Sequence, residues 1–344
     1  MSVAKSIILK APFDSDLPGP EHFEISSADI SPLEGEGSIQ VQLIGISPDP
    51  FLRMRMKTTG DTKAGSVISG FVVGKVILSN GNEKWTVGDL FGAMLPFTTI
   101  QNVTADAIGK TLMWKLTDLI DESDISLGLG ILGMPGSTAY GGLIDVLRPK
   151  EGEIVFVSAA SGAVGGLVGQ LAKNVFGCKV IGSCGGPKKV QLIKEKFGYD
   201  EAIDYKTTTD KAALKAALKA VAPEGIDMYF ENVGGMHFEV SFESLRQGGR
   251  IAVCGGISEY NNAEMNLIKF NPMAMVYGLQ RIEGFISVPW LSGARGNFLK
   301  EMHGWWREGK LKVQETRFDG IEAWPEAFQS LFTGKNLGKV ILML

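Results

Sequence analysis

Cysteine and long apolar runs are scarce in this sequence, and each scarcity excludes a class of protein. Its 344 residues include only Cys178, Cys184 and Cys254. Because this odd set has no CxxC spacing, it argues against a disulfide framework and against a structural zinc site. No run of about 18 apolar residues occurs, and the apolar run near the start is too short for a signal peptide. We therefore expect a cytoplasmic protein with no membrane partner.

Neither sign of charge dominates the chain. The 34 Lys and Arg and the 38 Asp and Glu give a formal net charge of -4 and are mixed along the sequence. The one cluster of like charge, the lysines of residues 211–220, has the spacing of the solvent-facing stripe of an amphipathic helix. No basic tract therefore indicates a nucleic-acid partner.

Histidine is equally scarce, which limits the chemistry that the side chains can perform. His22, His237 and His303 are widely separated, and none neighbours a cysteine or paired acid at ligand spacing. Zinc catalysis therefore lacks its ligands, and no histidine is placed by a local motif to serve a serine nucleophile. The chemistry that is left belongs to a cofactor, for which the protein supplies position and electrostatics.

Two kinds of organisation follow one another along the chain. Residues 38–46 and 67–78 predict strands without long helices between them, whereas strands and helices alternate from residue 127 onward. The predicted strands of this second part are 153–158, 179–183, 201–204, 225–230, 249–254 and 281–285. After a helix over 298–309, strands at 311–317 and 338–342 are expected to return to the first domain. The prediction is α/β: a doubly wound parallel sheet (127–310) with a β-rich domain (1–126 and 311–344).

The segment from Val155 to Gln170 predicts a buried strand that turns into a helix through small residues. Gly162, Gly165 and Gly169 lack a Cβ where the backbone turns, where a pyrophosphate would approach and where helix meets strand. The positive end of the helix would then face the anion. Tight packing without a ligand is the alternative that this spacing leaves open.

The second strand decides which dinucleotide is favoured. A site for NAD usually places an acid about 20 residues after the glycine turn. Here the strand at 179–183 leads instead into Gly185-Gly186-Pro187-Lys188-Lys189, and the next carboxylate is Glu195. The missing acid and the lysines leave room and positive charge for a 2′-phosphate, so NADP is favoured over NAD.

Several motifs in a fixed order carry a family resemblance. They are residues 47–56 (SPDPFLRMRM), 134–140 (MPGSTAY), 159–165 (AASGAVG), 230–235 (FENVGG) and 336–339 (NLGK). Together they resemble the zinc-independent medium-chain dehydrogenase/reductases, in the branch of prostaglandin and leukotriene reductases, plant alkenal double-bond reductases and bacterial curcumin reductase. The resemblance spans nearly the whole chain. It implies a GroES-like domain beside a Rossmann domain, and a homodimer.

The resemblance also implies a reaction and a set of site residues. The reaction is NADPH-dependent reduction of the double bond of α,β-unsaturated aldehydes and ketones, by hydride transfer to the β-carbon without metal. The residues implied to bind the cofactor are Gly162, Ala163, Val164 and Gly165 at the pyrophosphate, Lys189 and Tyr205 at the 2′-phosphate, Asn232, then Cys254, Gly255, Gly256, Ile257, Ser258 and Tyr260 near the nicotinamide ribose, Phe285, Ile286 and Ser287 beside the nicotinamide, and Asn336.

Tyr260 is the hydroxyl that we expect near the substrate oxygen. A neutral tyrosine can donate a hydrogen bond to an enolate, although it is a modest acid at neutral pH. Ribose binding alone is the alternative role. Phe51 stands where many members of the family have tyrosine, so a second substrate-facing hydroxyl is absent and a shared substrate preference does not follow.

Two other functions stay open at this point. The same cofactor serves quinone reductases, so NADPH-dependent quinone reduction is an alternative within the enzymes. A nucleotide-binding protein whose catalysis is vestigial is the alternative from another class, and the presence of Tyr260 and Asn232 argues against it.

The missing acid and Lys189 together generate a prediction. Lys189→Ala is expected to weaken NADPH binding by about 1.5–3 kcal/mol, the range for a hydrogen bond to a charged group, and to leave NADH binding nearly unchanged. Titration of both dinucleotides against the wild type and the variant checks this, with Lys188→Ala as the matched control. An equal loss for both dinucleotides contradicts the assignment.

Overall fold

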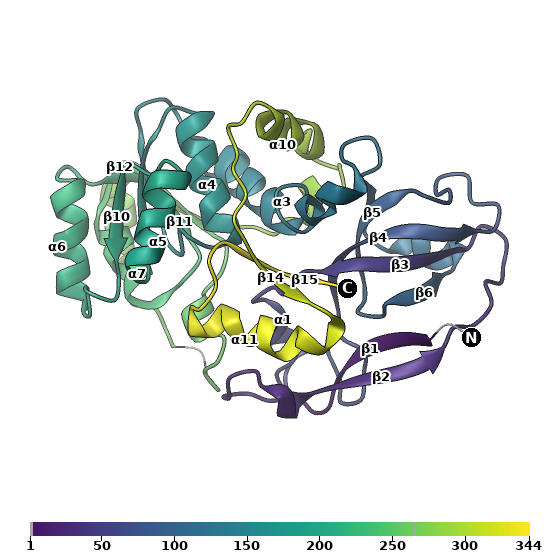
Figure 1. Cartoon of the computed structure of the whole chain (residues 1–344). Coiled ribbons are helices and arrows are strands. Elements are labelled where there is room, and N and C mark those ends of the chain that lie inside the picture. The colour runs from purple at the N-terminus through teal and green to yellow at the C-terminus, as the bar shows by residue number, and fades with distance from the viewer. Residues whose placement is uncertain (1–2, 265) are drawn as a thin grey trace. The chain divides into compact units, whose positions relative to one another are not determined.

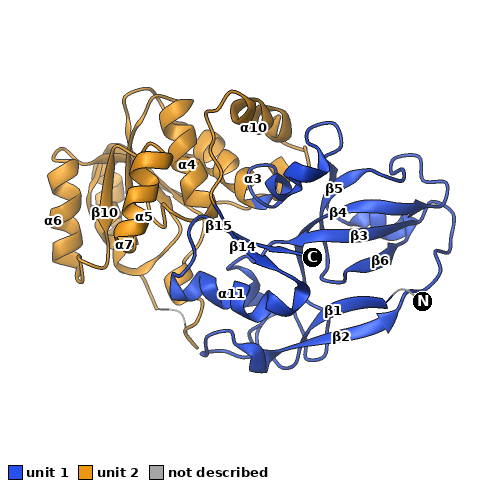
Figure 2. Ribbon diagram, viewed as in Figure 1, with its two compact units in different colours: residues 1–134, 315–344 blue, residues 135–314 orange. Residues whose placement is uncertain are grey.

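The computed structural model describes residues 3–264 and 266–344 and divides into two compact units. One comprises Met1–Met134 with Glu315–Leu344, and the other comprises Pro135–Gln314 (Figure 2). The first unit is rich in strands and the second holds a parallel sheet with helices (Figure 1). The predicted fold class, a Rossmann sheet with a second β-rich domain, is confirmed.

The first unit is built on a seven-stranded sheet. Its strand order is β14-β15-β3-β4-β5-β7, with β6 also paired to β3, and β1 and β2 form a separate antiparallel pair. The strands are β1 (Val3–Leu9), β2 (Phe23–Asp29), β3 (Ile39–Ile46), β4 (Ser69–Ser79), β5 (Leu90–Pro96), β6 (Ile100–Val103), β7 (Met113–Lys115), β14 (Glu315–Asp319) and β15 (Lys339–Met343), with helices α1 (Leu52–Arg55), α2 (Ala105–Lys110) and α11 (Trp324–Thr333). Residues from the C-terminal segment join this sheet because β15 pairs antiparallel to β3, with Leu342 opposite Ile46.

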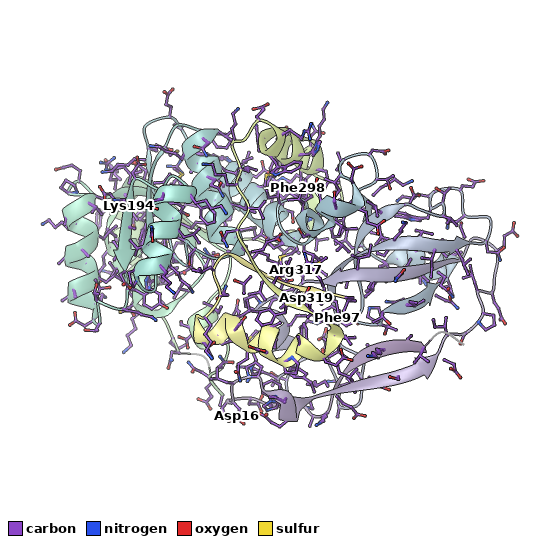
Figure 3. The ribbon with its side chains drawn as sticks, in the orientation of Figure 1. Asp16, Phe97, Lys194, Phe298, Arg317 and Asp319 are labelled. Atoms are coloured by element: carbon purple, nitrogen blue, oxygen red, sulfur yellow. The ribbon has the colours of Figure 1, made fainter. Side chains whose placement is uncertain are left out.

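Aromatic side chains hold the C-terminal helix α11 in the core of the first unit. Trp324 and Phe328 are fully buried and stack at 5.0 Å with an interplanar angle of 10°. Phe97, labelled in Figure 3, lies 5.1 Å from the Trp324 ring. Large aromatic rings contribute much of the buried area of a core, so this cluster explains why residues distant in sequence share one unit.

The strand predicted at residues 311–317 is wrong in its start, because β14 begins only at Glu315. The backbone N–H and carbonyl of Lys312 form hydrogen bonds with a side chain, that of Gln170, instead of with a neighbouring strand. Its N–H donates to Gln170 Oε1 at 2.6 Å, and its carbonyl accepts from Gln170 Nε2 at 3.1 Å. A backbone group that a side chain has satisfied in this way does not need a sheet partner.

The second unit is a six-stranded parallel sheet, and the six strands that the sequence predicts are all present. Their order is β10-β9-β8-β11-β12-β13. They span β8 (Ile154–Val157), β9 (Lys179–Cys184), β10 (Glu201–Asp204), β11 (Ile226–Glu231), β12 (Leu245–Val253) and β13 (Arg281–Gly284). The chain runs outward from β8 in one direction and then continues from β11 in the other. The order therefore reverses between β8 and β11, and ligands bind beyond the carboxyl ends of the strands at such a point.

Helices surround this sheet, as Figure 1 shows. They are α3 (Met134–Tyr140), α4 (Ala163–Asn174), α5 (Pro187–Gln191), α6 (Lys211–Val221), α7 (Gly235–Glu243), α8 (Pro272–Gly278), α9 (Val288–Leu291) and α10 (Phe298–Arg307), with π-helical turns at Gly141–Leu147 and Leu192–Lys196. Phe156 stacks on Tyr229 at 5.4 Å, and Leu214 and Leu218 of α6 belong to the same buried cluster. The apolar stripe that the sequence predicts beneath the lysines of α6 is therefore in the core.

The turn from β8 into α4 is tight. Ala159 has a left-handed φ of 49°, and its carbonyl accepts the N–H of Gly162 at 2.9 Å. A Cβ on Gly165 would lie 2.4 Å from that same carbonyl oxygen, and one on Gly169 would lie 2.1 Å from the ring of Tyr199. The hydroxyl of Tyr199 in turn donates to the Gly165 carbonyl at 2.6 Å. Glycine is therefore required where α4 presses on its strands.

The two glycines of this turn give a matched pair of variants. Gly165→Ala is expected to lower the free energy of unfolding by about 1–3 kcal/mol, because its Cβ meets backbone atoms that cannot move aside cheaply. In Gly162→Ala the nearest atom would be 3.2 Å away, and φ is −82°, so a smaller loss is expected. Urea unfolding of both variants measures the difference, and equal losses contradict the account of the turn.

Candidate functional site

Most of the predicted site residues lie just beyond the carboxyl ends of the strands of the parallel sheet. Gly162 and Gly165 follow β8, Asn232 follows β11, and Cys254 follows β12. The strand order reverses between two of these strands, β8 and β11. Asn336 belongs to the other unit, where its Nδ2 donates to the Gly338 carbonyl at 3.0 Å.

The N-terminus of α4 offers a place for an anion. Gly162 is its N-cap residue and carries no side chain to occupy the end of the helix. The N–H groups of the first turn, which includes Ala163, Val164 and Gly165, have no acceptor within the helix. Because α4 extends over 12 residues, its dipole adds to the attraction for negative charge.

Ser158 ties the end of β8 to the turn after β11. Its Oγ accepts the backbone N–H of Asn232 at 2.9 Å, and its carbonyl accepts from Asn232 Nδ2 at 2.7 Å. The amide nitrogen of Asn232 is therefore engaged within the protein. The side chain is held in one orientation at the point where the two halves of the sheet meet.

The loop after β12 is tied to the same turn. Ile257 N–H donates to the Asn232 carbonyl at 3.1 Å, and Ser258 Oγ donates to the Val233 carbonyl at 2.6 Å. Tyr260 bends back over this loop, so that its Oη accepts the Gly256 N–H at 3.3 Å. Burial raises the pKa of Tyr260 above its usual value, so the phenol keeps its proton and can donate it to another acceptor.

A second group of predicted residues meets at the end of β9. Lys189 is half-buried, and burial lowers its pKa, with Cys184 and Lys206 close enough to influence it. Tyr205 covers the preceding turn, since a Cβ on Gly185 would lie 2.7 Å from its ring. No acid lies within ion-pair distance of Lys189 among residues 3–264 and 266–344. The structure thus brings two lysines and a tyrosine to an edge without a pairing carboxylate.

Asp204, the nearest acid to this group in the sequence, has a structural role. Its Oδ1 accepts the N–H of Gly186 at 2.8 Å and of Lys206 at 3.0 Å. One carboxylate therefore shapes both turns from which the cations project. An anion such as a phosphate, bound by Lys189 and Lys206, fits this edge better than a ribose diol that needs an acid of its own.

The remaining predicted residues have mixed placements. The ring of Phe285 lies 6.0 Å from both Phe230 and Trp290, within an aromatic cluster. Ile286 is exposed, and Ser287 is the N-cap residue of α9. The Phe285 ring therefore packs against other aromatic rings of the protein. The backbone of residues 285–287 follows the end of β13.

The cysteines at the strand ends are thiols and not thiolates. Burial raises the pKa of Cys184 and of Cys254 to about 12 each. All three cysteines of the chain are free. Because the thiolate is the reactive form, neither residue supplies a nucleophile at neutral pH.

Three contributors to this site were not predicted from the sequence. Ser158 and Glu231 become partners only because β8 and β11 are neighbours in the sheet, which no local pattern reveals. Lys206 stands beside Tyr205, and its charge was a usable signal that the prediction did not take up.

Two kinds of feature are absent from the part of the chain that the structure describes. Within it, no group of three or more His, Cys, Asp or Glu side chains is arranged to hold a metal ion. None of the helices there is both long enough and apolar enough to span a membrane.

Two family models match parts of the chain, and known proteins are similar to it over nearly its whole length. The family described as N-terminal domain of oxidoreductase matches residues 5–111, and the family described as zinc-binding dehydrogenase matches residues 163–292. Prostaglandin reductase 1 of Bos taurus is 38% identical and covers 98% of both chains. The NADP(+)-dependent 2-alkenal reductase of Nicotiana tabacum is 39% identical, over 99% of this chain and 97% of that one.

Solved structures agree with these relatives. CurA from Vibrio vulnificus is 33% identical, with a TM-score of 0.86, and covers 99% of this chain and 98% of that one. Its complex with NADPH has a TM-score of 0.84, with 98% of each chain covered. These relatives and the confirmed fold together identify the chain as an oxidoreductase of the medium-chain dehydrogenase/reductases, in the branch of the prostaglandin and alkenal reductases.

Proposed function

We propose that this protein uses NADPH to reduce the carbon–carbon double bond of α,β-unsaturated aldehydes and ketones. The observation that carries the proposal is the pairing of an acid-free, lysine-bearing end of β9 with a neutral phenol, Tyr260, on the loop after β12. Relatives named prostaglandin reductase 1, 2-alkenal reductase and (+)-pulegone reductase support it.

The cofactor contacts are part of this proposal. The first turn of α4 would hold the pyrophosphate, because its N–H groups and dipole suit an anion. Lys189 and Tyr205, with Lys206 added, would bind the 2′-phosphate. Asn232 and the loop 254–260 would contact the ribose and nicotinamide, with residues 285–287 and Asn336 as the remaining contacts.

The protein's own groups would act on the substrate oxygen. NADPH supplies the hydride that reaches the β-carbon. Negative charge then develops on the carbonyl oxygen, and a preformed hydrogen-bond donor stabilises it more than it stabilises the substrate. Tyr260 would be that donor, since burial keeps its proton in place. A proton from a hydroxyl or from water would then be transferred to the α-carbon of the enolate. The proposed reaction uses no metal ion.

We also propose the setting in which this chemistry occurs. Residues 1–126 and 311–344 would form the substrate domain, and residues 127–310 would bind the cofactor. The three free cysteines support a reducing compartment, for which the cytoplasm is our proposal.

A homodimer joined through β13 completes the proposal. This strand ends the sheet, so one of its edges has no partner among the described strands, and such edges invite pairing. Exposed apolar residues surround it: Val276, Tyr277, Leu279, Ile286 and Val288. In an antiparallel pairing with Ile282 on the two-fold axis, Arg281 would face Glu283 of the partner subunit, and the reverse contact would form by symmetry.

The role of Tyr260 gives a kinetic prediction. Tyr260→Phe is expected to lower kcat for enone reduction about 10- to 100-fold, the effect of losing one hydrogen bond to a charged oxygen, and to change NADPH affinity little. NADPH oxidation with medium-chain 2-alkenals and enones measures it.

The pH profile of the wild type checks the protonation state of Tyr260, and the Tyr260→Phe variant separates the two roles left open for this residue. Because the pKa of Tyr260 is raised, the wild type should lose no kcat through phenol deprotonation below about pH 10. A variant that keeps kcat but binds NADPH weakly would favour ribose binding alone. No turnover of any conjugated enone by the wild type would contradict the proposed function.

The charges on β13 test the dimer. Glu283→Arg would replace the Arg281–Glu283 pair, 3.7 Å apart within each subunit, by like charges. It would also place like charges opposite each other in the proposed pairing, so it is expected to shift the protein toward monomer. The exchange Arg281→Glu with Glu283→Arg restores opposite charges and should restore the dimer. Light scattering on a sizing column measures both variants. A monomeric wild type, or no difference between the variants, contradicts this interface.

A further inference from the structure

Glu231, the last residue of β11, is an acid in an unusual position. It is 1% exposed, and a buried charge is normally paired with an opposite one. No Lys, Arg or His side chain of residues 3–264 or 266–344 is within ion-pair distance of its carboxyl group. The carboxyl group is therefore kept buried without a cation.

Its hydrogen bonds are directed at the turn that follows β11. Oε1 accepts from the N–H of Val233 at 2.5 Å, from the N–H of Gly234 at 2.9 Å and from Ser158 Oγ at 3.2 Å. Its other oxygen, Oε2, is buried and has no hydrogen bond of normal geometry among the described residues, and the Tyr229 hydroxyl acts on the same carboxyl group. One oxygen thus fixes both N–H groups beyond Asn232.

The backbone of Glu231 extends the same connection to the loop after β12. Its carbonyl accepts the N–H of Cys254 at 2.9 Å and of Gly255 at 3.1 Å. Glu231 therefore joins three segments: the end of β8 through Ser158, the turn at 232–234 and the start of the loop at 254–260. The proposed function assigns the ribose and nicotinamide of the cofactor to the last two of these segments.

We propose that Glu231 is a positioning residue for the dinucleotide, whose buried carboxylate holds the Asn232 turn and the Ser158 hydroxyl in the shape that binds NADPH, at a cost to the stability of the fold. The inference rests on the proposed function only in naming NADPH as the ligand. Hydrogen bonds to an ionised acceptor are stronger than those to a neutral one, so the charge of Glu231 makes this turn more rigid.

The cost to stability follows from the burial. Desolvation raises the pKa of Glu231, and the hydrogen bonds from Gly234 and Val233 offset only part of that effect. A carboxyl group whose pKa is raised by folding favours the folded state most when it is protonated, and this contribution is lost as the pH rises through the folded-state pKa. At any pH above its folded-state pKa, the ionised Glu231 therefore weakens the fold that it shapes.

Other titratable groups near Glu231 do not change charge over the same range. Burial raises the pKa of Tyr229 well above its usual value and that of Cys254 to about 12. On the buried side of α7, the pKa of His237 is lowered to about 4 by burial. Glu259 lies on the loop after β12, where burial opposes its ionisation but hydrogen bonds from Asn266 and Asn262 lower its pKa overall. Glu231 is thus the carboxyl group in this part of the described structure whose pKa is raised.

The experiment compares Glu231→Gln and Glu231→Asp with Glu239→Gln. Glu239 lies on α7, where it pairs with Lys211 at 2.9 Å and accepts the N–H of Lys269, so its variant removes the same charge without removing a hydrogen bond of the turn. NADPH affinity is measured by titration calorimetry and the melting temperature by calorimetric scanning, each in mildly acidic and in alkaline buffer. Because the 2′-phosphate titrates near pH 6, the ratio of the variant Kd to the wild-type Kd is compared at each pH.

Glu231→Gln is expected to raise the Kd for NADPH about tenfold in alkaline buffer while melting at or above the wild-type temperature. In acidic buffer the Kd ratio should fall toward 1, because the amide resembles the protonated carboxyl group. Glu231→Asp, which keeps the charge, should bind NADPH more tightly than Glu231→Gln, and Glu239→Gln should leave the Kd unchanged.

Three results would overturn the inference. They are a Gln variant that does not fold or melts below the wild type in alkaline buffer, a Kd ratio that is independent of pH, and an Asp variant that binds no better than the Gln variant. The first would assign Glu231 a structural role alone. Because none of these readouts uses an enone, failure of the proposed reaction would be seen separately, as NADPH binding without turnover.

Discussion

The close approach of α4 to the Ala159 carbonyl is the constraint on which the site depends. Ala159 adopts a left-handed conformation, and only glycine at position 165 leaves room for the carbonyl oxygen of Ala159. Tyr199 holds the helix from its other side through the Gly165 carbonyl. The end of α4 is thereby placed at the reversal of the strand order, where the dipole of the helix and the ends of β8 and β11 meet. A bulkier turn would move the anion site away from that edge.

Charge is distributed around this edge in a consistent way. Cations without a pairing acid gather at the end of β9, while the groups at the ends of β11 and β12 are a neutral phenol, a neutral thiol and one buried acid. A phosphate and a developing enolate are both anionic: lysines suit the phosphate, and a hydrogen-bond donor such as the phenol of Tyr260 suits the enolate oxygen that we propose. Ser158 and Glu231 connect the ends of β8, β11 and β12, so the segments that we propose for hydride transfer are one hydrogen-bonded assembly.

Much of the fold could be predicted from the sequence because its signals are local. The fully apolar run at 154–157 predicted a strand buried on both faces, and the helix spacing after it predicted α4. The predicted start of β14 was wrong because the side chain of Gln170, far away in sequence, forms hydrogen bonds with the backbone of Lys312. Ser158 and Glu231 escaped prediction for the same reason, since their contacts exist only once β8 and β11 are adjacent. The roles assigned to Lys189 and Tyr260 stay predictions.

The destination of the hydride tests the central claim most directly. Enzyme, a simple enone and NADPH that carries deuterium at the transferred position of the nicotinamide are allowed to react, and the product is examined by NMR. The account predicts a saturated ketone with deuterium on the β-carbon and a solvent proton on the α-carbon. Deuterium on the carbonyl carbon of an unsaturated alcohol, or an enone left unchanged while NADPH is bound, would contradict it.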